Sequence, residues 1–101
     1  MKPANNAPVY CSLYSELAEV CRKHGYALAI HGSLARDFDI IAIPWVENPS
    51  IPDDVIKEIT RDFALKDSGA KTTKLHGRIV YTLVFCGGDV FIDLSFMPCK
   101  E

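Results

Sequence analysis

Two aspartates that stand two residues apart, Asp37 and Asp39, alternate along the chain with the apolar residues Phe38 and Ile40. This alternation predicts a β-strand, because residues i and i+2 of a strand point to the same face of a sheet. Phe38 and Ile40 would enter the core, and the two carboxylates would stand side by side on the opposite face. Parallel carboxylates repel each other unless a cation lies between them. The pair therefore predicts a half-buried strand with a candidate metal site on its polar face.

Length and composition predict one globular domain that spans residues 1–101. Apolar residues make up 49% of the chain and charged residues 24%, as in ordinary soluble proteins. The net charge of −2 gives no overall attraction to nucleic acids or anionic membranes, so polyanion binding would need a local patch. The longest apolar runs are far too short to span a bilayer, and residues 1–8 contain no signal-like hydrophobic segment. We therefore expect a cytoplasmic protein without membrane contact.

The four cysteines, Cys11, Cys21, Cys86 and Cys99, have no metal-knuckle spacing, and the histidines are scattered among them. We expect free thiols that behave as small hydrophobic residues, which fits a reducing compartment. His31, beside Gly32, is interpreted as a structural histidine at a strand end.

Periodicity and breaker residues predict an α+β fold: one small mixed or antiparallel sheet with two helices packed on one face. Ser50 and Asp53 resemble a capping box at the start of the second helix. The expected elements are a helix over 9–24, strands over 27–30 and 37–43, a helix over 52–66, a polar connector over 67–74, and strands over 78–85 and 90–96.

The last two strands predict a hairpin, because Gly87-Gly88 suits a two-residue turn. That turn places Asp93 opposite Thr82. The covered face would carry Ile79, Tyr81, Leu83, Phe85, Val90, Ile92, Leu94 and Phe96, and the mixed face Arg78, Val80, Thr82, Val84, Phe91, Asp93 and Ser95.

A lone aspartate in the middle of a strand is unfavourable, so Asp93 calls for an explanation. It is either hydrated on an exposed face, or it completes a carboxylate triad with Asp37 and Asp39 on neighbouring strands. Three such carboxylates would suit Mg²⁺ or Mn²⁺, which bind few protein ligands and leave positions for phosphate oxygens. Lys74 and Arg78 belong to a basic stretch that enters the hairpin. This stretch either holds a triphosphate or a nucleic-acid acceptor, or, for Lys74, is an ordinary solvated loop.

Gly-Ser-x-Ala-Arg over residues 32–36, Asp-x-Asp over 37–39 and a single later aspartate together resemble the nucleotidyltransferase superfamily that includes polymerase beta. The likeness is nearest to the minimal nucleotidyltransferase domains of prokaryotes. It implies that Asp37, Asp39 and Asp93 are the catalytic, metal-binding residues. It also implies that Gly32, Ser33 and Arg36 contact the nucleotide. Phe91, which flanks Asp93 on the same strand face, is a candidate wall for the base.

Three functions stay open from the sequence. The first is metal-dependent transfer of a nucleoside monophosphate from a nucleoside triphosphate such as ATP to a protein or RNA acceptor. The second is a non-catalytic domain that senses nucleotides or binds a partner, for example a toxin-like protein, because Arg36 directly precedes Asp37 where family members have a longer connection. The third is an unrelated small α+β interaction protein.

Overall fold

The computed structural model describes residues 7–32, 37–85 and 91–98. Its elements, in chain order, are α1 (Ala7–Lys23), β1 (Tyr26–His31), β2 (Asp37–Pro44), α2 (Pro52–Asp62), β3 (Leu65–Thr73), the short 3₁₀ helix η1 (Leu75–Gly77), β4 (Ile79–Phe85) and β5 (Phe91–Phe96).

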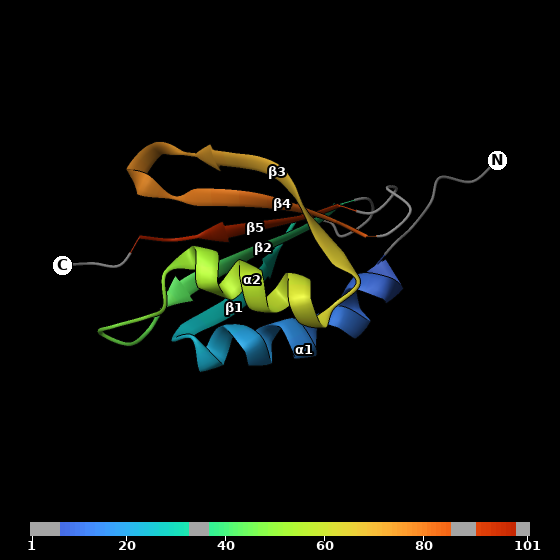
Figure 1. Cartoon of the computed structure of the whole chain (residues 1–101), viewed down its shortest axis with the longest axis horizontal. Coiled ribbons are helices and arrows are strands. Elements are labelled where there is room, and N and C mark those ends of the chain that lie inside the picture. Colours follow the sequence, from blue (N-terminus) through green and yellow to red (C-terminus); the bar gives the residue numbers. More distant parts are fainter. Residues whose placement is uncertain (1–6, 33–36, 86–90, 99–101) are drawn as a thin grey trace.

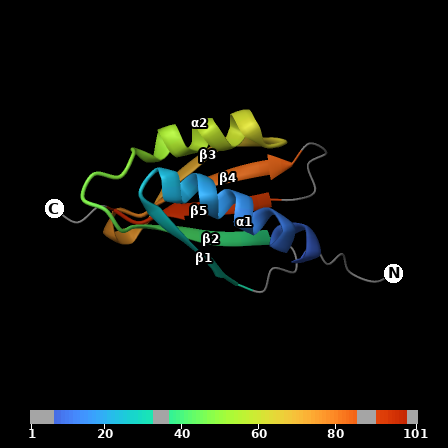
Figure 2. The same ribbon diagram turned by 90° about the horizontal axis from the view of Figure 1, so that it is seen from below.

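The five strands form one mixed sheet in the order β1-β2-β5-β4-β3, with β2 and β5 parallel and the other pairs antiparallel. Both helices pack against the same face of this sheet (Figures 1 and 2). The predicted α+β architecture, a mixed sheet with two helices on one face, is therefore confirmed. The opposite face of the sheet, which no helix of the described chain covers, is called the open face below.

The core lies between the helices and the sheet because each element places its apolar side chains on the facing side. Tyr10 of α1 stacks on Phe38 of β2 with ring centroids 4.9 Å apart, and both side chains are fully buried. Tyr26 and Tyr81 each meet Phe96 edge to face. Alternation along β2 buries Phe38, Ile40 and Ala42, so the intervening Asp37 and Asp39 are held on the open face.

The prediction of a helix to residue 66 followed by a polar connector was wrong. α2 ends at Asp62, where Phe63 adopts an extended conformation (φ −120°, ψ 159°), and the expected connector is strand β3. β3 lies at the edge of the sheet, and Leu65 is its one buried residue, so the sequence lacks the apolar alternation of an inner strand. The β3–β4 register shifts between Asp67 and Lys71, where Gly69 has φ +84°. The residues of this irregular segment are typical of turns, which is a second reason why the sequence indicated a connector.

The hairpin register is confirmed, because Thr82 pairs with Asp93. The predicted covered face is also found: Tyr81, Leu83, Ile92, Leu94 and Phe96 are buried. The Gly87-Gly88 turn, Val90 and the Phe85 side chain lie outside what the structure describes.

The predicted capping box is wrong. The N-cap of α2 is Ile51 and no side chain caps the helix, because the Ser50 hydroxyl is engaged by His24 instead.

Two expectations concern the thiols and the membrane. Cys11 is exposed, Cys21 is buried, and both are free, as predicted; Cys86 and Cys99 lie outside the described residues. Within the described segments, neither helix has the length and apolarity needed to cross a bilayer.

Candidate functional site

Two of the predicted site carboxylates lie side by side at the centre of the sheet. The parallel register of β2 and β5 pairs Asp39 directly with Asp93, and Asp37 with Phe91. Because side chains alternate along both strands, Asp37, Asp39 and Asp93 all stand on the open face, opposite the buried Phe38. The spacing of two residues in β2 and the register of β5 together fix this arrangement.

The Asp39 carboxyl occupies an unfavourable position for an anion. Partial burial raises its pKa above the ordinary value, and the nearby charge of Asp93 and a hydrogen bond with the Asp93 carboxyl raise it further. The charge of His31 acts in the opposite direction, and Asp37 adds a smaller repulsion. Asp93 also accepts a hydrogen bond of 2.9 Å from the Thr82 hydroxyl, which fixes one of its oxygens. A cation placed between these carboxylates would relieve the repulsion.

A groove of about 280 Å³ brings this acidic pair together with two cations. Its walls come from β1, β2, β3, β4, β5 and the segments beside them, so it runs across the open face. The lining residues are His31, Asp39, Thr72, Lys74, Arg78, Val80, Thr82, Asp93 and Ser95. The structure thus places the predicted nucleotide contacts Lys74 and Arg78 in the same groove as Asp39 and Asp93.

Lys74 and Arg78 are held in this position by the link between β3 and β4. The Lys74 N–H donates a 2.6 Å hydrogen bond to the Arg78 carbonyl, which closes the turn around η1. Lys71, earlier in the basic stretch, points elsewhere: it pairs across the strands with Tyr81 on the helix-covered face and lies 3.7 Å from Asp53. The basic stretch is therefore divided between the two faces of the sheet.

Gly32 supports the acidic pair directly. Its backbone has φ +87°, and a Cβ at this position would lie 2.9 Å from the Asp39 Oδ2 atom. The glycine therefore gives the Asp39 carboxylate room against the chain that leaves β1. The sequence predicts a contact of Gly32 with phosphate, whereas in the structure a side chain at this position would meet a carboxylate.

The remaining predicted site residues either do not line the groove or lie outside the described residues. Phe91 is 39% exposed and stands beside Asp37 at the start of β5, and neither residue lines the groove. Ser33 and Arg36 lie outside the described residues. Within residues 7–32, 37–85 and 91–98, no three His, Cys, Asp or Glu side chains gather in a geometry that would hold a metal ion.

Sequence reasoning missed four polar groove residues, Thr72, Thr82, Ser95 and His31, and the apolar Val80 as members of the site. Thr72 was hidden because β3 was taken for a connector. Thr82 and Ser95 were placed on the correct face without a role. His31 had a usable signal: β1 and β2 are antiparallel and their short connection pairs His31 with Asp39.

Comparisons with known proteins support the fold of this chain. No protein-family model matches the sequence, and no curated protein matches it. A chain in a solved structure of the GLD-2/RNP-8 complex has a similar fold, with a TM-score of 0.52 and 10% sequence identity. The likeness covers 92% of this chain and 39% of that chain, so the present chain spans about two fifths of its length.

At this identity the likeness shows the fold alone.

Proposed function

We propose that this protein is a metal-dependent nucleotidyltransferase that transfers a nucleoside monophosphate from a nucleoside triphosphate to a hydroxyl of a protein or RNA acceptor. The observation that carries the proposal is the pairing of Asp39 with Asp93 on the open face, in one groove with Lys74 and Arg78. Adjacent carboxylates facing cations suit a substrate that is bound through a metal ion at one end and through phosphate oxygens at the other. The fold likeness to a nucleotidyltransferase supports the same assignment.

The donor set fits Mg²⁺ or Mn²⁺. Both ions prefer oxygen ligands, and Mg²⁺ is commonly held by one or two carboxylates together with substrate phosphates rather than by a complete protein cage. Asp39 and Asp93 would hold the ion, and Asp37, two positions before Asp39 on the same face, would add negative charge beside it. When bound, the ion would neutralise phosphate charge and polarise the phosphoryl group under attack.

Different side chains of the protein would carry out proton transfer, phosphate binding and contact with the base. Asp93, which accepts a hydrogen bond from the Thr82 hydroxyl, would orient the acceptor hydroxyl and accept its proton. Lys74 and Arg78 would bind the outer phosphates at the other end of the groove. Phe91 would offer an apolar wall to the base. Gly32 would keep the Asp39 carboxylate in position, and the adjoining Ser33 and Arg36 would contact phosphates as the sequence pattern implies.

Calorimetric titration with a non-hydrolysable nucleoside triphosphate in the presence and absence of Mg²⁺ tests the binding half of the proposal. We expect Mg²⁺-dependent binding by the wild-type protein and its loss in Asp39→Asn. Asp62→Asn is the matched control, because it removes the same charge from an exposed position on α2 that pairs with Arg61. Binding that is equal in all three proteins would place the nucleotide elsewhere.

Pyrophosphate release with candidate protein and RNA acceptors tests the transfer half. Asp93→Asn should still bind the nucleotide but lower transfer by ~100-fold or more, as expected for loss of a general base. Binding without pyrophosphate release from any acceptor would favour a non-catalytic nucleotide sensor or partner-binding domain. A wild-type protein that binds no nucleotide at millimolar concentration would refute the transferase and the nucleotide sensor, and would leave the partner-binding domain as the favoured alternative.

A further inference from the structure

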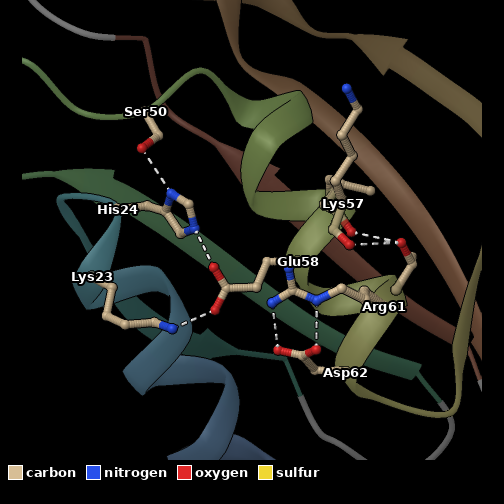
Figure 3. A network of polar contacts seen from close by, with 9 residues as sticks. Lys23, His24, Ser50, Lys57, Glu58, Arg61 and Asp62 are labelled. Atoms are coloured by element: carbon tan, nitrogen blue, oxygen red, sulfur yellow. Dashed lines mark hydrogen bonds and ion pairs between the residues drawn. The ribbon is translucent and has the colours of Figure 1, made fainter.

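Three polar residues form a hydrogen-bonded line on the helix side of the molecule, away from the open-face groove. The line contains Ser50, His24 and Glu58. His24 follows α1, Ser50 lies ahead of α2, and Glu58 lies within α2. The His24 Nδ1 atom is 2.7 Å from the Ser50 Oγ atom, and the His24 Nε2 atom is 2.9 Å from the Glu58 Oε1 atom (Figure 3). None of the three lines the groove of the proposed nucleotidyltransferase site.

The backbone on both sides of the serine is fixed. The Ser50 N–H donates a 2.9 Å hydrogen bond to the His24 carbonyl, and the Ser50 carbonyl accepts a 2.7 Å hydrogen bond from the Tyr26 hydroxyl. The His24 and Glu58 side chains are only 17% and 15% exposed. The serine, the imidazole and the carboxylate are therefore held in one arrangement without a ligand, as a reactive group requires.

The partners of His24 determine which ring nitrogen carries the proton. A hydrogen bond to Lys23 and another to His24 hold the pKa of Glu58 below its ordinary value, so its carboxylate is an acceptor. The carboxylate therefore selects the tautomer with a proton on Nε2, and Nδ1 is left with a lone pair for the Ser50 hydroxyl. This is the polarity in which an imidazole withdraws a proton from a serine.

Ser50 also forms part of the wall of a hollow of about 410 Å³ on the same side of the molecule. Much of the rest of the wall is apolar and includes Pro49, Ile51, Ile79, Phe96, Met97 and Pro98. Glu47, Asn48 and Tyr26 add polar groups to a lining that is otherwise mostly apolar, and such a cavity suits a small, largely apolar ligand with a reactive centre at Ser50. A short acyl chain has this chemistry, with its carbonyl at Ser50 and its alkyl group against the apolar wall.

We propose that Ser50, His24 and Glu58 form a second site that hydrolyses carboxylic esters with short apolar acyl groups. The Ser50 Oγ atom attacks the ester carbonyl as its proton passes to the His24 Nδ1 atom. The C–O bond to the alcohol then breaks, and the departing oxygen takes that proton. Water, activated by the same nitrogen, hydrolyses the acyl-serine and restores the hydroxyl, so that one ester and one water give one acid and one alcohol. Glu58 is a positioning residue, because it acts through His24.

Covalent labelling of the full wild-type chain gives the first test. A fluorophosphonate should add once, and peptide mapping should find the adduct on Ser50. Ser12, an exposed serine whose hydroxyl donates to the Val9 carbonyl, is the internal comparison and should stay unmodified. An adduct on other serines, or none at all, overturns the proposal, and this measurement requires no variant to fold.

Hydrolysis of p-nitrophenyl butyrate gives the second test. Ser50→Ala should lower the rate by ~100-fold or more, whereas Ser12→Ala should leave it unchanged. Glu58→Gln should lower kcat and leave KM near its wild-type value, since Glu58 orients the base and lies off the acyl cavity. A purely structural link between α1 and α2 would lower the melting temperature of these variants with no ester hydrolysis in the wild type, and that result refutes the site.

Discussion

Replacement of Gly32 by alanine tests the support that this glycine gives to Asp39. Gly32 has φ +87°, a region in which an alanine costs about 1–2 kcal/mol of folding free energy. The added Cβ would also lie 2.9 Å from the Asp39 Oδ2 atom, so the carboxylate must shift from its present position. The Oδ2 atom is the far end of a side chain that can move aside, so this contact adds a cost smaller than overpacking of a core would. We expect Gly32→Ala to lower the free energy of unfolding by the sum of both effects.

Gly69 provides a matched control for the backbone part of this cost. It has nearly the same φ, +84°, but a Cβ there would meet no atom within 4 Å. Gly69→Ala should therefore show the backbone cost alone, and the entropic effect of the glycine replacement on the unfolded chain cancels in the comparison. Urea denaturation measures both variants, and each kcal/mol corresponds to about 4–8 °C in Tm for a domain of this size.

A double-mutant cycle isolates the contact itself. In an Asp39→Ala background the next atom that the Gly32→Ala methyl would meet is the residue 39 Cβ at 3.6 Å, an ordinary contact distance. The cost of Gly32→Ala should then fall to that of Gly69→Ala. Equal costs of the two glycine substitutions in the wild-type background would refute the view that Gly32 positions Asp39.

Three further predictions concern stability and thiol reactivity. Because burial and the charge of Asp93 raise the folded-state pKa of Asp39, the metal-free protein should lose stability as the pH rises from about 3.9, the ordinary value for aspartate, through the folded pKa. Asp39→Asn should flatten that part of a urea-midpoint curve measured from pH 3 to 7, and an unchanged slope would contradict the reasoning. Phe38→Ala should lower the free energy of unfolding by about 3–5 kcal/mol, measured by chemical denaturation, because the ring is fully buried. Cys11 should react with iodoacetamide at pH 8 in the native protein, whereas Cys21, whose pKa burial raises to about 12, should react only after unfolding, as mass mapping would show.

The parts of the fold that the sequence predicted are those in which local pattern and burial agree. Alternation along β2 gave the strand and its two faces, and the hairpin register followed from one assumed turn. β3 was missed because an edge strand needs little apolar alternation, and its composition is that of a loop. Only pairing with β4, which is a non-local contact, makes this segment a strand.

In the candidate site, too, local sequence pattern predicted some features, whereas contacts between distant segments determine the others. The face on which Asp39 and Asp93 stand could be derived from strand periodicity, but their direct pairing depends on the parallel alignment of β2 with β5, which joins two aspartates 54 positions apart in the sequence. The role of Gly32 could not be found from the sequence, because a turn glycine next to a phosphate and a turn glycine next to a carboxylate have the same residue pattern. The contact of Ser50 with His24 was hidden by the resemblance of Ser50 to a helix cap.

The pKa of Asp39 distinguishes two explanations for carboxylates on the open face: that they are merely hydrated, or that they form a site for a cation. A carboxylate that is merely hydrated on an open face has no reason for a raised pKa, whereas Asp39 is partly desolvated and held against the like charge of Asp93. Without a cation this arrangement destabilises the folded state near neutral pH, so Asp39→Asn should raise the melting temperature of the metal-free protein. The same substitution should remove the stabilisation that millimolar Mg²⁺ gives the wild-type protein, because only the folded state brings Asp39 and Asp93 together. A gain in metal-free stability coupled to a loss of the Mg²⁺ response is the result that a binding site predicts and a hydrated surface does not.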